Sequence, residues 1–133
     1  MTTPANDVTA TSSSTGLAAN VAGALAYVIG PVTGIAFFFI EKENQFVRFH
    51  AAQSITVSAI LIAASIAVSV VSAVLAVVPI LGWLIALALT AGLGLASFGL
   101  WLVLMYKAYS GEEWEVPVAG PLARKLLTSS IPK

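Results

Sequence analysis

The residues best suited to chemistry lie in one polar insert at 41–53, which reads EKENQFVRFHAAQ and separates two long apolar runs. The insert holds the only histidine of the chain, His50, together with Arg48 and Gln53. Imidazole titrates near neutrality, so His50 could sense protons. Imidazole and amide groups can instead satisfy backbone groups that lipid leaves without water. The insert is therefore the first candidate for a functional site.

Catalysis and metal binding find little support in the sequence. A catalytic site needs paired titratable groups, a nucleophile with a base, or a metal. The acidic residues lie beside cations at the margins of apolar runs, where they form exposed pairs more simply. One histidine without any cysteine cannot build a typical transition-metal site within one chain. We expect a protein that is not an enzyme and has no cofactor or metal.

The composition indicates an integral membrane protein. Of the 133 residues, 59% are hydrophobic and only 9% are charged, which lies far from the usage of soluble domains. The formal net charge is zero, so no basic patch for nucleic acid is indicated. The lipid bilayer is the first expected partner.

Three apolar runs predict an all-α bundle with three transmembrane helices. The runs cover 17–40, 51–78 and 83–106, and each could cross a hydrocarbon core of about 30 Å as a helix. We expect a disordered Ser/Thr-rich tail at 1–16, a membrane domain at 17–110 and an interfacial cytoplasmic tail at 111–133.

The first run contains Gly30 and Pro31 near its middle, where proline removes a backbone donor and crowds the carbonyl of Tyr27. The run is then either a kinked helix or a pair of half-helices that line a substrate site. We favour the kinked helix because no second broken run is visible in the sequence.

Small residues recur at every fourth position in the second and third runs, which is typical of helices that pack closely in membranes. The stripes are Ala59, Ala63 and Ala67; Ser65, Ser69 and Ala73; and Ala88, Gly92 and Ala96. Pro79, Gly82 and Trp83 indicate a tight turn between the two runs. We therefore expect an antiparallel hairpin.

Three crossings would place every cation on the side of the polar insert and the C-terminus. The cations are Lys42, Arg48, Lys107, Arg124, Lys125 and Lys133. By the positive-inside rule, the C-terminus is cytoplasmic and the N-terminus lies outside the cell membrane. We expect Arg124 and Lys125 of the amphipathic C-terminal segment to bind lipid headgroups, with a merely solvated tail as the alternative.

A helix that begins near Phe46 would place Phe46, Phe49, His50 and Gln53 on one stripe, with Arg48 on the opposite face. We predict that this stripe is a packing and recognition site in which His50 and Gln53 satisfy backbone groups. Proton sensing by His50 is the alternative.

The octet FVRFHAAQ lies at 46–53, between an apolar run interrupted by Gly-Pro and a predicted hairpin that is followed by VPVAG. With this pattern the chain resembles a family of small uncharacterised prokaryotic membrane proteins. That family is distantly similar to the plastid inner-envelope protein-import component. The resemblance implies a compact helical domain without an assigned catalytic residue.

These observations favour a scaffold or accessory subunit of the plasma membrane that works through helix–helix packing, as a homo-oligomer or within a larger complex. An oligomeric channel or transporter is the first alternative, motivated by the interrupted run and the polar stripe. A component that aids protein translocation or insertion is the second alternative, and it rests on the resemblance alone.

Overall fold

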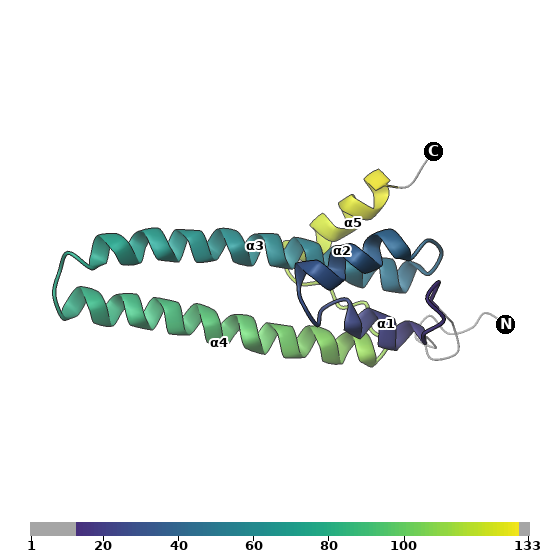
Figure 1. The fold of residues 1–133 in the computed structure, drawn as a ribbon, viewed down its shortest axis with the longest axis horizontal. Coiled ribbons are helices and arrows are strands. Elements are labelled where there is room, and N and C mark those ends of the chain that lie inside the picture. Colours follow the sequence, from purple (N-terminus) through teal and green to yellow (C-terminus); the bar gives the residue numbers. More distant parts are fainter. Residues whose placement is uncertain (1–12, 131–133) are drawn as a thin grey trace.

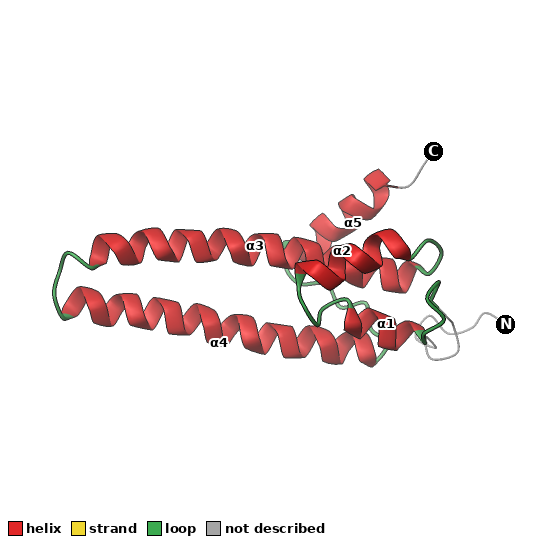
Figure 2. Ribbon diagram, viewed as in Figure 1, coloured by secondary structure: helices red, strands yellow, loops and turns green. Residues whose placement is uncertain are grey.

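The computed structural model describes residues 13–130, which form five helices (Figures 1 and 2). They are α1 (Ala19–Leu25), α2 (Pro31–Ile40), α3 (Gln45–Leu75), α4 (Leu81–Tyr109) and α5 (Ala119–Ser130). The predicted all-α class is confirmed for this part of the chain. Most of the predicted N-terminal tail, at 1–12, lies outside the described residues.

Helices α3 and α4 form a long antiparallel hairpin, as predicted (Figure 1). With 31 and 29 residues they reach about 46 and 43 Å at 1.5 Å per residue. Both are long and apolar enough to cross a membrane. In the most apolar 18-residue stretch of each helix, only 6% is buried within the protein. So large an exposed apolar surface fits a lipid environment.

The turn between these helices is tight, as predicted. A Cβ on Gly82 would lie 1.9 Å from the carbonyl oxygen of Leu75, so only glycine fits there. The indole of Trp83 donates to the carbonyl of Ala76 at 3.2 Å, which joins the two sides of the turn.

Of the two forms predicted for the first apolar run, the structure has the broken one and not the favoured kinked helix. Helices α1 and α2 have 7 and 10 residues, about 10 and 15 Å, and neither could cross a bilayer alone. Gly30 has φ +51°, which favours glycine, and Pro31 starts α2 at a position where its missing N–H costs nothing. The chain reverses there, so α1 and α2 lie beside one end of the hairpin (Figure 1). A third spanning helix is not confirmed.

The carbonyls released by this break are paired within the protein, as an apolar surrounding requires. The carbonyl of Ala26 accepts from Thr33 Oγ1 at 3.1 Å. The carbonyl of Tyr27 accepts from the indole of Trp101 on α4 at 2.7 Å, and that of Gly30 accepts from Ser54 Oγ on α3 at 2.9 Å. The turn at 26–30 is thus fastened to both long helices.

The small-residue stripes do not form the contact between α3 and α4. The less exposed side of α3 carries Val57, Leu61, Ala64, Val68 and Ser72 instead. The predicted stripes are exposed, and a Cβ added to Gly92, Gly94 or Gly99 would meet nothing within 4 Å. These surfaces of the hairpin are open to close approach by another molecule.

Candidate functional site

The octet at 46–53 forms the first turns of α3. This helix begins at Gln45, one residue before the predicted start near Phe46, because Asn44 caps it with a side-chain oxygen that accepts from Val47 N at 3.2 Å. Every residue from Phe46 to Gln53 is buried. The predicted stripe therefore faces the protein interior at the polar end of the hairpin, where α1, α2 and α5 surround α3.

His50 lies fully buried at the centre of this junction. The rings of Tyr27, Phe46 and Phe49 surround the imidazole edge-on, with centroid distances of 4.6–5.5 Å. Its Nε2 lies 2.9 Å from the carbonyl oxygen of Glu112, and its Nδ1 lies 2.7 Å from Tyr27 Oη. Because a carbonyl can only accept, Nε2 carries the proton and Nδ1 accepts from the Tyr27 hydroxyl. A neutral imidazole thus satisfies both of its nitrogens.

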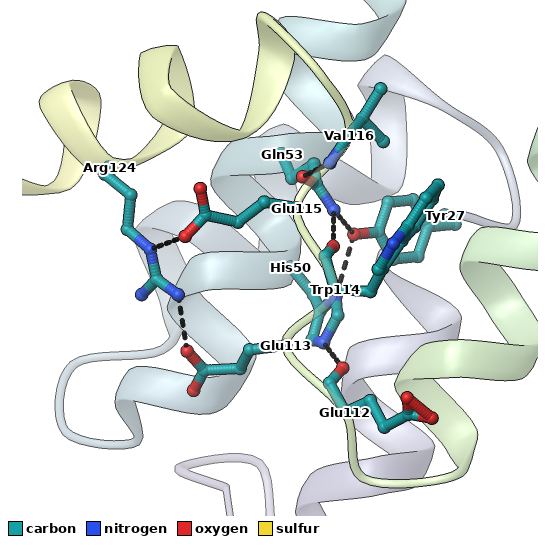
Figure 3. Close-up of polar contacts among 9 residues, drawn as sticks. All are labelled: Tyr27, His50, Gln53, Glu112, Glu113, Trp114, Glu115, Val116 and Arg124. Atoms are coloured by element: carbon teal, nitrogen blue, oxygen red, sulfur yellow. Dashed lines mark hydrogen bonds and ion pairs between the residues drawn. The ribbon is translucent and has the colours of Figure 1, made fainter.

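Gln53 extends the same network by one helical turn. Its Nε2 donates to Tyr27 Oη at 3.0 Å and to the carbonyl of Trp114 at 2.9 Å, while its Oε1 accepts from Val116 N at 2.9 Å. His50 and Gln53 therefore hold the backbone of Glu112, Trp114 and Val116, as Figure 3 shows.

The two phenylalanines of the octet shape the surroundings of His50. Phe46 packs with Ala19 and Ala22 of α1, and a Cβ on Gly23 would lie 2.9 Å from its ring. On the other side, the Arg124 guanidinium of α5 lies 4.0 Å from the centroid of the Phe49 ring, in cation–π contact. The stripe thus joins both terminal segments of the domain to α3.

Arg48 points away from this network, as predicted, and binds the end of α2. Its Nη1 donates to the carbonyl of Phe38 at 3.0 Å and to that of Glu41 at 2.7 Å. Unpaired carbonyls and the negative end of the helix dipole gather at a helix C-terminus, so a cation is favourable there. Arg48 stabilises the reversal between α2 and α3.

Glu41 is a buried anchor of the polar insert that residue type and spacing did not predict. Its carboxylate is fully buried and accepts from Ser14 N at 2.7 Å, Ser14 Oγ at 2.6 Å, Asn44 N at 2.9 Å and Glu43 N at 3.3 Å. Burial opposes the charge, but these hydrogen bonds outweigh it and lower the pKa of Glu41 below its ordinary value. The carboxylate holds the start of the described chain against the polar insert.

The two cations predicted to bind headgroups lie on α5. Arg124 forms ion pairs of 2.9 Å with both Glu113 and Glu115 (Figure 3), so its guanidinium is engaged within the protein. Lys125 is exposed. Contact with lipid headgroups stays a prediction for both residues.

The polar side chains of the octet support the backbone around them. Arg48, His50 and Gln53 pair mainly with backbone atoms. Within residues 13–130 no three His, Asp or Glu side chains gather to hold a metal. Tyr27 and the segment at 112–116 complete the network, although their sequence showed no motif. A tyrosine next to the Gly-Pro break was the one available hint.

These features define a helical membrane protein with a two-helix hairpin and a polar junction at one end. Residues 10–123 match the Magnetosome magnetite crystal formation protein family, MamF/MmsF. The chain belongs to this family.

Several relatives are small archaeal membrane proteins. A UPF0132 membrane protein of Methanocaldococcus jannaschii is 44% identical over 84% of this chain and 91% of the relative. A UPF0132 membrane protein of Archaeoglobus fulgidus is 45% identical over 80% of this chain and 92% of the relative. The resemblance to small uncharacterised prokaryotic membrane proteins is thereby confirmed, and no solved structure matches the chain.

The junction yields a prediction on stability. We expect His50→Ala to lower the free energy of unfolding by roughly 3 kcal/mol, because it leaves a cavity and unpairs Tyr27 and the Glu112 carbonyl. Tyr27→Phe, which removes one hydroxyl, should cost about 1–2 kcal/mol. Thermal unfolding in mild detergent measures both. Tyr109→Phe is the control because Tyr109 is exposed, and melting temperatures unchanged by His50→Ala would contradict the structural role.

Glu41 yields a prediction on pH. Its lowered pKa means that the folded state prefers the carboxylate, so this stabilisation is complete above the ordinary pKa of 4.5. The stabilisation from Glu41 is lost as the pH falls below 4.5 and through the lowered pKa of the folded state. Glu41→Gln should weaken this acid-dependent loss of melting temperature, whereas Glu43→Gln on the exposed side of the loop should not. Identical pH profiles for wild type and Glu41→Gln would exclude the proposed tether.

Proposed function

We propose that this chain is a non-enzymatic scaffold or accessory subunit of a membrane, which works by packing its hairpin against other membrane helices. The names of the relatives support the membrane location alone. The division of the molecule into a fastened polar end and an open apolar end supports the packing role.

The polar end is held by contacts that leave little freedom for rearrangement. Glu41 binds Ser14, Arg48 binds the end of α2, and His50 and Gln53 bind the segment before α5. Rigid elements lose little entropy when they bind a partner. This end therefore serves as a base that orients the hairpin.

The open face of α4 is the main support for the packing role. Ala88, Gly92, Ala96 and Gly99 follow one another at spacings of four, four and three, and all are exposed. A Cβ at Gly92 or Gly99 would meet nothing within 4 Å. In lipid, helices associate where small residues let their backbones approach, since no hydrophobic effect drives them together. This face is suited to a second copy or to a helix of a partner subunit.

Cysteine cross-linking tests this contact cleanly because the chain has no cysteine. We expect Gly92→Cys in native membranes to form disulfide dimers, or adducts with a partner subunit. The control is Leu87→Cys, on a different side of α4 that is also exposed, which should form few. Equal cross-linking at both positions, or none at either, would count against a specific α4 interface.

We further propose that the polar end faces the cytoplasm, with α1 and α2 dipping into the bilayer and returning to the same side. The cations of the described residues lie at this end; they are Lys42, Arg48, Lys107, Arg124 and Lys125. The turn at 76–80 carries none. The bonds between Ser14 and Glu41 support a cytoplasmic position for 13–16, instead of the outside position expected from three crossings.

Labelling of single cysteines with a membrane-impermeant maleimide tests this topology. In intact cells we expect labelling of Val77→Cys at the turn, whereas Thr15→Cys and Lys42→Cys should react only after permeabilisation. Three crossings would give a different pattern, in which Thr15→Cys reacts together with Val77→Cys while Lys42→Cys stays protected.

A further inference from the structure

A cleft of about 370 Å³ lies between α3 and α4. It is lined by Ser65, Val68, Ser69, Thr90, Leu93, Gly94 and Ser97. Ser65, Ser69 and Thr90 are exposed and Ser97 is partly buried, so their four hydroxyl groups border open space. The cleft therefore combines an apolar floor with hydroxyls that are free to bind a ligand.

The cleft lies deep in the apolar part of the hairpin. Along α3, Ser65 is about 15 Å from Leu75 at the turn and about 17 Å from Ser54 at the polar junction. In a bilayer this position is near the middle of the hydrocarbon core, where water is scarce. Hydroxyls at that depth pair with the preceding helical turn or with another molecule. A bound molecule that accepts hydrogen bonds can therefore be their partner.

The tip of the α1–α2 pair limits what can enter. Ser97 also lines a smaller cavity of about 100 Å³, which ends against Tyr27, Gly30 and Trp101. A Cβ on Gly30 would lie 3.4 Å from Ser58 Oγ on α3. The turn at 26–30 therefore lies on the same side of the hairpin as this smaller cavity. A straight partner helix laid along the cleft would meet this turn. A small molecule would fit beyond it.

We infer that the cleft binds a neutral, lipid-soluble carbonyl compound, whose oxygens accept hydrogen bonds from Ser65, Ser69, Thr90 and Ser97. The volume lies within the range of about 300–1,000 Å³ that small-molecule sites occupy. Hydroxyl donors without a charged group in the lining select a neutral acceptor. Val68 and Leu93 would contact the apolar body of the ligand.

Tryptophan fluorescence can test this site with a decyl-substituted benzoquinone, a quenching probe of the required chemistry. Trp83→Phe and Trp114→Phe leave Trp101, which borders the adjoining cavity, as the single reporter. In phosphatidylcholine nanodiscs we expect saturable quenching. Gly94→Leu should abolish it by filling the cleft, whereas Leu89→Phe, at an exposed side chain of α4 outside the cleft lining, should preserve it. Gly94 has open space for a side chain, so Gly94→Leu should fold.

The hydroxyls are tested by a variant that keeps the cleft volume. Ser65→Ala, Ser69→Ala and Thr90→Val together should weaken the saturable binding by about tenfold or more, since each lost hydrogen bond contributes modestly. Quenching that stays linear with the probe and equal in all variants would overturn the site. Saturation that Gly94→Leu removes but the hydroxyl variants leave unchanged would overturn the carbonyl assignment and indicate an apolar chain.

Discussion

The fold depends on how His50 and Gln53 hold the backbone of the irregular segment at 112–116. A segment outside a helix lacks the internal hydrogen bonds of a helix, so beside an apolar hairpin its N–H and C=O groups need partners from elsewhere. The two side chains, one turn apart on α3, pair with two carbonyls and one N–H of that segment. Tyr27 connects both to the broken first run. One small polar network thus fixes the path of the chain before and after the hairpin.

The same constraint explains the different character of the two ends of the molecule. At the polar end, side chains support the places where the chain changes direction: Arg48 at the end of α2, Ser54 and Trp101 at the broken run, and Glu41 by binding Ser14 ahead of α1. The long helices satisfy their own backbones, so the rest of the hairpin needs no such support. Its surface is free to carry small residues and hydroxyls for other molecules.

Much of the candidate site followed from residue types and spacing. The octet's stripe of Phe46, Phe49, His50 and Gln53, with Arg48 opposite, was predictable because a helix places residues three and four apart on one face. It was also predictable that His50 and Gln53 would form hydrogen bonds with backbone groups. Their partners were not, because Glu112 and Trp114 contribute carbonyls, and every residue type carries a carbonyl.

The sequence by itself determined the membrane class, the all-α content of the described residues and the antiparallel hairpin, because apolar run lengths and turn residues act locally. Tertiary structure alone decided that the first run breaks into α1 and α2 and returns to the polar end. Its length would have allowed a crossing, but the break is stable only where Thr33, Ser54 and Trp101 pair its carbonyls. Two of those partners lie on other helices, and local sequence does not encode such distant contacts.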